Sequence, residues 1–402
     1  MGRPRRRPSN SPGQLLFRMI SVRKSLLVSA VLLPVSLAAQ CSSTLYSSGT
    51  YGTAQGASGT AQYVVYMPQP ATCFNGDVIV FAHGYIAQGS PSNAWLSQSM
   101  LPDGTSIPGL VNSLGFGFAA SGFSKDGLAI LQGIQDTNAL TNVIQGLSIP
   151  VHKYFVAGAS EGGLIAAKLV EESTLFAGGV AVCGPIGDFQ KQINYFADVR
   201  DLFDYFFPGV LTSAGGSAVE IPTGLLANWT TTYEPAVVAA LKAKPMATRQ
   251  LMRTAGISIG RSPQNAENAI TGALWYNAFA TNDAVATLGG NPYGNIGRVY
   301  RESFNDASLN AQVARFAESS AAMAQIQNYQ TTGLLGSLSS HYTRSPTRSF
   351  PLGTSRYTLA KAQAASSSSE LTQITAISYG HCNITAPDAE AAVLALLIKA
   401  GL

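Results

Sequence analysis

Short runs of apolar residues alternate with longer amphipathic stretches over the first half of the chain. The run Asp77–Ala82 is apolar at almost every position, which is typical of a strand covered on both faces in a parallel sheet. Between residues 127 and 146 the apolar residues follow helical spacing instead. Strands are predicted at Tyr63–Met67, Asp77–Ala82, Phe116–Ala120, Tyr154–Ala157 and Gly179–Cys183, and a helix after Gly163 that ends near Glu172. Strands that alternate with helices in this way predict an α/β fold with a mainly parallel central sheet.

The pattern changes after Cys183. Residues 184–330 contain no clear strand, but they contain helix-like pieces and an aromatic-rich opening. We interpret them as a helical cap inserted over the carboxyl edge of the sheet, whose aromatic residues either contact substrate or fill the insertion's own core. The alternating run Thr372–Ser378 predicts a late strand, and Asp388–Lys399 a closing helix with Thr385 as its N-cap. The core of the fold is therefore predicted in two parts, residues 40–183 and 331–402.

The N-terminal region, residues 1–39, has the pattern of a secretory signal. An apolar stretch at residues 26–39 follows Arg18, Arg23 and Lys24 and ends in small residues. This order predicts cleavage after Ala38 or Ala39, and the stretch is short for a membrane span. We expect a secreted or periplasmic protein without a stable membrane span after the signal is removed, whether translation starts at Met1 or at Met19.

The overall charge of the chain is misleading. The 402 residues, 46% of them hydrophobic and 11% charged, carry a formal net charge of +4. Residues 1–40 hold seven of the 25 basic residues and no acidic one, so the remainder has 18 basic against 21 acidic residues, a net charge of −3. A chain without a basic surface is not expected to bind nucleic acid.

The cysteines all follow the predicted signal, at positions 41, 73, 183 and 382. An even number of cysteines in an exported chain predicts disulfides rather than free thiols. We expect two bridges, and first of all Cys41 with Cys73, because both precede the strand at Asp77–Ala82. Their spacing does not resemble a Cys/His metal site, so neither a metal nor another cofactor is expected.

The segment Gly158-Ala159-Ser160-Glu161-Gly162-Gly163 lies between a predicted strand and a predicted helix. This context is typical of a nucleophile elbow, in which the serine is raised above the sheet at a helix N-terminus. The turn is too sharp for a Cβ two residues before or after the serine, which explains glycine at 158 and 162. Ser160 is thus the candidate nucleophile, and the backbone N–H of Glu161 a candidate oxyanion donor.

A serine hydroxyl needs an adjacent base, and the chain has only four histidines, at positions 83, 152, 341 and 381. His381 follows the last predicted strand, where a hydrolase of this topology places its base. His152 opens the strand that leads into the elbow and should lie at the opposite end of the sheet. His341 is expected to be an ordinary strand residue near the site and is the lesser alternative for the base. After the strand Asp77–Ala82, the backbone N–H of Tyr85 is the second candidate oxyanion donor.

Four short motifs together resemble the α/β-hydrolase superfamily. They are Phe81-Ala82-His83-Gly84-Tyr85, the elbow at residues 158–163, Cys183-Gly184-Pro185-Ile186-Gly187-Asp188-Phe189 and Gly380-His381-Cys382-Asn383. The chain is similar to secreted esterase or lipase-like members from about Gln62 onward. The resemblance implies a parallel sheet flanked by helices, a helical cap and a serine hydrolase mechanism, but it does not specify a substrate.

One position departs from this resemblance. Such hydrolases usually carry the acid of the catalytic triad in an Asp-Pro loop after the penultimate strand, and this chain has Ser345 before Pro346. Either Asp188 supplies the carboxylate from a neighbouring position, or another acid such as Asp198 or Glu370 does, or the site has no acid. Loss of the aspartate alone costs about 10⁴-fold in turnover.

The sequence therefore favours an exported serine hydrolase that acts on carboxylic esters of small or lipid-like molecules. Ser160 would form the acyl-enzyme, with His381 as the base. A peptidase of the same fold is the alternative enzyme. A hydrolase fold kept as a weakened binding protein is the alternative from another class, and Ser345 is its motivation.

Overall fold

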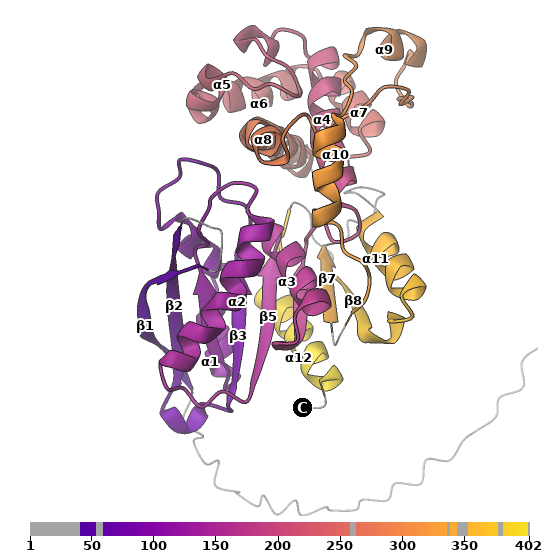
Figure 1. The fold of residues 1–402 in the computed structure, drawn as a ribbon. Coiled ribbons are helices and arrows are strands. Elements are labelled where there is room, and N and C mark those ends of the chain that lie inside the picture. Colours follow the sequence, from indigo (N-terminus) through magenta and orange to yellow (C-terminus); the bar gives the residue numbers. More distant parts are fainter. Residues whose placement is uncertain are drawn as a thin grey trace, which may run out of the picture. The chain divides into compact units, whose positions relative to one another are not determined.

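The structure, a computed structural model, describes residues 41–53, 59–257, 263–335, 338–343, 353–376 and 381–400. Its centre is one sheet with the strand order β1-β2-β4-β3-β5-β6-β7-β8. The strands are β1 Ser42–Gly52, β2 Thr60–Gln69, β3 Asp77–Ala82, β4 Gly117–Ser121, β5 Lys153–Ala159, β6 Phe176–Val182, β7 Leu338–Thr343 and β8 Leu371–Ala376 (Figure 1).

The direction of the strands identifies the fold. β2 is antiparallel to both β1 and β4, whereas β4, β3, β5, β6, β7 and β8 pair with one another in parallel. An antiparallel strand beside an otherwise parallel sheet in this order is the arrangement of the α/β-hydrolase fold. The predicted fold class is therefore confirmed.

Helices cover both faces of the sheet, as the side chains of β3 require. Val78 and Val80 belong to a core with α2 Ile130–Gly146 and α3 Glu161–Glu172. Ile79 and Phe81 point to the other face and pack with α1 Ile107–Ser113 and α12 Ala386–Lys399. Because successive side chains of a strand alternate, the nearly continuous apolar run fills two cores at once.

A helical segment connects β6 to β7. Its helices are α4 Phe189–Phe206, α5 Thr223–Ala227, α6 Glu234–Ala243, α7 Pro245–Thr254, α8 Pro263–Leu288, α9 Asp306–Gln312 and α10 Ser320–Ile326 (Figure 1). Most of its apolar side chains form a separate core around Phe203, Trp229 and Leu274. Several aromatic residues that the sequence left open, such as Phe203 and Phe207, thus fill the insertion's own interior, whereas Phe196 borders a cavity beside Ser160.

Helix α8 joins this segment to the sheet layer. The carboxylate of Asp283 accepts hydrogen bonds from the backbone N–H of Leu128 and from the side chain of Gln88, both at 2.5 Å. The hydroxyl of Tyr85 donates to the carbonyl oxygen of Phe279 at 2.9 Å. These contacts hold α8 against the loops that follow β3 and β4.

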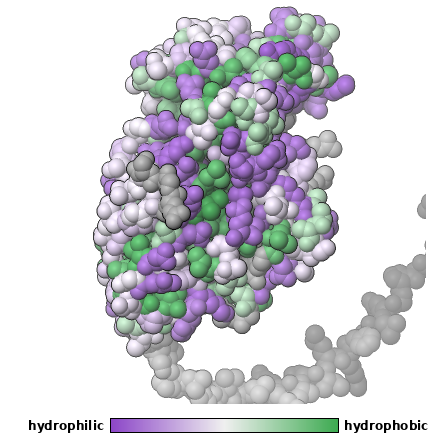
Figure 2. Space-filling view, viewed as in Figure 1, coloured by the Kyte–Doolittle hydropathy of each residue, from purple (hydrophilic) through white to green (hydrophobic). Residues whose placement is uncertain are grey.

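Most large apolar side chains lie in the interior, and fewer are exposed at the surface. Figure 2 shows hydrophilic and neutral residues over most of the viewed face, with hydrophobic residues in small patches. Among the described residues, no helix is both long enough and apolar enough to cross a membrane. Residues 1–40, with the predicted signal, lie outside the described residues.

Several elements differ from the sequence prediction. β1 was not predicted, because most of its side chains are exposed and it lacks an apolar alternation. Helix α11 Gly353–Ala364 was not predicted either. The late strand starts one residue earlier than expected, and its predicted end at residues 377–378 lies outside the described residues. The N-cap of α12 at Thr385 is confirmed, within a capping box that includes Asp388.

Both expected disulfides are present. The predicted bridge Cys41–Cys73 ties the start of β1 to the turn before β3. The remaining cysteines, Cys183 and Cys382, form the second bridge over a sequence separation of 199 residues. It joins the end of β6 to the segment that precedes α12, and so links two parts of the chain that lie on either side of the helical insertion.

Candidate active site

The turn between β5 and α3 has the geometry of a nucleophile elbow. Ser160 has φ of 56°, a left-handed conformation that a residue with a Cβ rarely adopts. A Cβ on Gly158 would lie 2.0 Å from the carbonyl oxygen of Gly162, and a Cβ on Gly162 would lie 2.0 Å from that of Ala82. Only glycine fits these two positions, as the sequence predicted, because backbone approaches backbone there.

The structure brings the side chains of Ser160 and His381 together. The distance between His381 Nε2 and Ser160 Oγ is 2.7 Å, across 221 residues of sequence. His381 lies between β8 and α12, next to the bridged Cys382. This contact puts a nitrogen base within hydrogen-bond reach of the elbow hydroxyl, which is the first geometric requirement for activating a serine.

Burial sets the protonation of the histidine. His381 is partly exposed by area, but the surrounding protein lowers the pKa of its ring to about 4, with desolvation as the cause. A neutral imidazole at pH 7 is able to accept a proton. His83 has a pKa near 4 for the same reason, but its Nδ1 contacts the carbonyl oxygen of Gly84 and its ring stacks on Phe123, so it supports the loop after β3.

The loop after β3 passes close to the elbow. A Cβ on Gly84 would lie 3.0 Å from the Cβ of Ser160, so glycine permits the approach. The side chain of Gln98 braces this loop: its Oε1 accepts from the N–H of Gly84 at 2.6 Å, and its Nε2 donates to the carbonyl oxygen of Tyr85 at 3.2 Å. Gln98 thereby fixes the two peptide groups beside the predicted oxyanion donor, the N–H of Tyr85.

The second predicted donor, the N–H of Glu161, belongs to the first residue of α3, where the helix supplies no carbonyl partner. The Glu161 side chain turns away from Ser160 and accepts a hydrogen bond from the N–H of Ala129 at 2.6 Å. Burial, and to a lesser extent the charge of Asp283, raise the pKa of Glu161 to about 8. The carboxyl group therefore adds little negative charge near the site at neutral pH.

Helix α8 contributes a tyrosine that the sequence did not single out. The ring of Tyr276 lies edge-on to that of His381, with 5.4 Å between centroids. Burial raises the pKa of Tyr276 to about 12, and the neighbouring Ser160 side chain opposes this rise. Tyr276 keeps its proton at neutral pH. No local motif marks it, because its place at the site depends on how α8 docks.

The three candidate acids of the triad contact other parts of the protein. The carboxylate of Asp188 caps α4 by accepting from the N–H of Lys191 at 3.2 Å, and it also contacts Gln330. Asp198 binds Tyr293, Tyr300 and Arg298 inside the insertion, and Glu370 binds Ser369. Each of these three carboxylates thus has partners other than His381. The Asp188 carboxylate is held by the N-terminal end of α4, which it caps.

Three other positions complete the comparison. Ser345 lies outside the described residues. His341 is in β7, paired with Val182 and Ile374, as an ordinary strand residue. His152 precedes β5 and its backbone N–H donates to the carbonyl oxygen of Gly76, at the end of the sheet opposite Ser160, as predicted.

A potential metal cluster is occupied by a covalent bond. Among the described residues, ligand atoms of Cys183, His381 and Cys382 lie within 4.8 Å of one another. The two sulfur atoms are bonded to each other, so neither is a thiolate.

Comparison with known proteins supplied only distant structural similarities. No protein-family model and no curated protein matches the sequence. Among solved structures, the rice cell wall degrading esterase LipA from Xanthomonas oryzae is 14% identical, with a TM-score of 0.44, over 90% of this chain and 91% of that one. The esterase Pf2001 from Pyrococcus furiosus is 10% identical, with a TM-score of 0.41, over 88% and 92%. An acylaminoacyl peptidase is 13% identical, with a TM-score of 0.27, over 38% and 25%.

Proposed function

We propose that this protein is an exported serine hydrolase that cleaves carboxylic esters through an acyl-enzyme on Ser160. The observation that carries the proposal is the 2.7 Å contact between His381 Nε2 and Ser160 Oγ. It joins a strained elbow serine to a histidine that burial keeps neutral. An activated hydroxyl beside unpaired helix N–H groups is suited to acyl transfer.

In the first step, His381 Nε2 takes the proton of Ser160 as Oγ attacks the acyl carbon. The carbonyl oxygen becomes an oxyanion, which the N–H groups of Tyr85 and Glu161 bind. When the tetrahedral intermediate collapses, the bond to the alcohol oxygen breaks, and His381 gives that oxygen the proton. The acyl group remains on Ser160.

In the second step, His381 removes a proton from water, and the hydroxide attacks the same acyl carbon. The oxyanion forms again in the same place, and its collapse returns the proton to Ser160 and releases the acid. Tyr276 has its own hydroxyl proton and packs edge-on to the ring of His381, so it helps to hold that ring in place. A carboxylate facing the other ring nitrogen of His381 would add further stabilisation of the imidazolium.

Export is supported by two observations. The first is the apolar stretch at residues 26–39 behind three basic residues. The second is the pair of disulfides, since such bonds persist in oxidising compartments.

A fluorophosphonate probe tests the nucleophile. The intact protein should be labelled covalently, and Ser160→Ala should not, because the probe reacts only with an activated hydroxyl. Ser99→Ala is a matched control that removes a different hydroxyl and should leave labelling intact. Equal labelling of the protein and Ser160→Ala would exclude the proposed mechanism.

Two panels of substrates, aryl esters and aminoacyl anilides, distinguish an esterase from a peptidase and from a binding protein. Hydrolysis of aryl esters with little or no turnover of aminoacyl anilides is expected for an esterase. The reverse preference would favour a peptidase. A folded protein that is neither labelled nor active on either panel would favour the weakened binding protein.

A further inference from the structure

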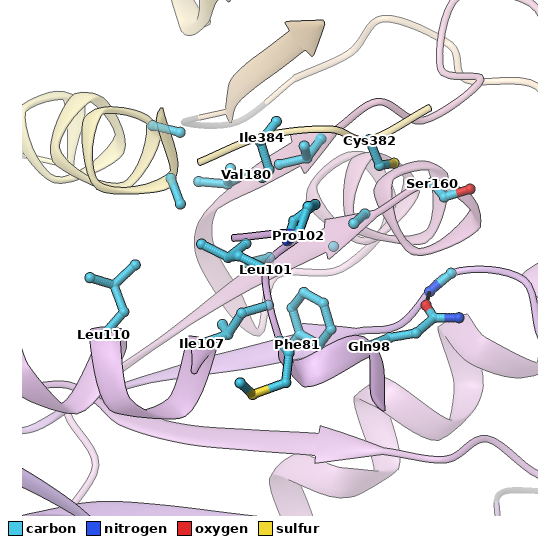
Figure 3. A pocket seen from close by; sticks show the side chains of 18 of the residues that line it. Phe81, Gln98, Leu101, Pro102, Ile107, Leu110, Ser160, Val180, Cys382 and Ile384 are labelled. Atoms are coloured by element: carbon cyan, nitrogen blue, oxygen red, sulfur yellow. Dashed lines mark hydrogen bonds between the residues drawn. The ribbon is translucent and has the colours of Figure 1, made fainter. Parts of the chain in front are cut away.

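A long apolar cavity begins at Ser160. Its volume is about 360 Å³, and it runs between the sheet and helices α1 and α12. Figure 3 shows Ser160 and Gln98 at one end and Leu110 at the other, with Phe81 and Ile107 between them. The cavity therefore extends from the reactive hydroxyl along one face of the sheet.

The chemistry of the wall changes along this length. Gln98, Ser160 and His381 make the reactive end polar, whereas Phe81, Leu110 and Val180 represent the apolar remainder. None of the described residues that line the cavity is Asp, Glu, Lys or Arg. A charged or strongly polar group placed beyond the reactive end would lose its hydration without finding a partner. Only an apolar group fits there.

The size of the cavity indicates a ligand site. Protein interiors are close-packed and have few voids larger than a water molecule. A volume of about 360 Å³ falls within the range of small-molecule sites, roughly 300–1,000 Å³. A second cavity, of about 100 Å³, meets the first at Ser160 and lies under α4 and α8. The site thus has a long apolar cavity and a shorter second cavity, which meet at Ser160.

We propose that the long cavity binds the acyl chain of the substrate, and that the natural substrates are esters of unbranched, medium-length fatty acids with a small alcohol. This inference rests on the proposed ester hydrolysis. The acyl chain stays bonded to Ser160 through both steps, whereas the alcohol has to leave before water attacks. Deep burial of the acyl chain is therefore compatible with turnover, and deep burial of the alcohol would delay its release.

A series of p-nitrophenyl esters, from acetate to octanoate, tests the chain preference. Each methylene that enters the cavity should raise kcat/KM about fourfold, until the cavity is filled. A parallel series of alkyl acetates, from ethyl to hexyl, should show no comparable rise, because its chain is on the alcohol.

Ala389→Phe tests whether the acyl chain binds in this cavity. Ala389 lines the cavity from the half-buried side of α12, so the ring would fill space meant for the chain. We expect kcat/KM for the octanoate to fall by about tenfold or more, with the acetate changed by no more than about twofold. Ala391→Phe is the matched control: it lies on the same helix, is exposed and does not line the cavity. It should leave both values unchanged.

The outcomes separate this inference from the proposed function. Labelling by fluorophosphonate and turnover of acetate without a rise toward octanoate would overturn the acyl pocket and leave the serine mechanism standing. If Ala389→Phe abolished a chain-length effect only in the alkyl acetates, the cavity would bind the alcohol. That result would also overturn the acyl pocket. Absence of labelling and of all turnover would instead refute the proposed function.

A second variant covers the case in which Ala389→Phe does not fold, judged by circular dichroism. Leu110→Ala enlarges the end of the cavity away from Ser160. It should shift the preferred acyl chain to a longer one and leave acetate turnover unchanged. An unchanged preference would contradict the proposal.

Discussion

At Ser160 a single residue accepts an unfavourable backbone conformation. Its φ of 56° costs on the order of 1–3 kcal/mol, which the neighbouring structure must hold in place. The glycines at 158 and 162 make this possible because any Cβ there would collide with backbone atoms. Such a constraint is local, so a sequence pattern is sufficient to predict it. The same conformation directs the hydroxyl toward His381.

Activity should persist in mild acid, because burial lowers the pKa of His381 to about 4. The ring has to be neutral to accept the proton of Ser160, so kcat/KM should fall only as the pH approaches that value. Initial rates on a neutral ester between pH 4 and pH 8 would measure this acid limb. A midpoint near 6.5, the ordinary value for histidine, would contradict the effect of burial.

Gln98 is expected to act as a positioning residue. Gln98→Leu removes the partner of the Gly84 N–H and the donor to the Tyr85 carbonyl. The loop should then hold the oxyanion donor less well, and kcat should fall about tenfold, less than when a donor itself is lost. Steady-state kinetics would show this as a change in kcat at nearly constant KM.

Gln98→Glu keeps the acceptor for the Gly84 N–H, but at neutral pH it loses the donated bond and adds a negative charge beside the oxyanion donors. It should recover part of the lost kcat only at a pH low enough to protonate the new carboxyl group. A change confined to KM in Gln98→Leu would contradict a positioning role.

Other residues of the site were beyond sequence reasoning. Chain order is sufficient to pair Ser160 with His381, because a known topology places both at one edge of the sheet. Gln98 and Tyr276 come from a 3-10 helix, Ala94–Ser99, and from α8, whose placement depends on tertiary packing. For Asp188, chain order was not sufficient. It follows β6, where a triad acid was considered, yet its carboxylate caps α4.

At the scale of elements, burial on two faces decided which strands could be predicted. β3, all of whose residues are buried, reads as a strand from its composition alone. β1 pairs along almost its full length with β2, but it forms the edge of the sheet and exposes most side chains. Its pairing comes from backbone hydrogen bonds, which leave no apolar pattern in the sequence.

The docking of α8 should depend on Asp283. Asp283→Ala leaves the buried N–H of Leu128 without its acceptor and removes the partner of Lys125, 3.9 Å away. We expect the free energy of unfolding to fall by about 1–3 kcal/mol. Because α8 also carries Tyr276, kcat/KM should fall as well. Urea denaturation and ester kinetics would measure the two effects.

Glu220→Ala provides the control for this prediction. Glu220 is an exposed acid of the same insertion, and its removal should change neither the unfolding free energy nor kcat/KM appreciably. If Asp283→Ala behaved like Glu220→Ala, its hydrogen bonds would not be what holds α8 in place.

At the scale of the molecule, the site is assembled from distant parts of the chain. The loop after β3, helix α8 and the segment before α12 each contribute one group, and the elbow after β5 contributes two. The insertion has its own core, yet its helix α8 reaches the serine. The sheet and the elbow therefore position Ser160, and the inserted helices add Tyr276 beside it.

The bridge between Cys183 and Cys382 makes the intervening polypeptide a covalently closed ring. A protease that cuts one peptide bond within that ring opens it without releasing a fragment. Ser160 precedes the ring and His381 lies inside it at the closure, so both remain on one molecule after a single nick. If the protein is exported as proposed, to a compartment where disulfides persist, this connection would keep its two parts together after such a cut.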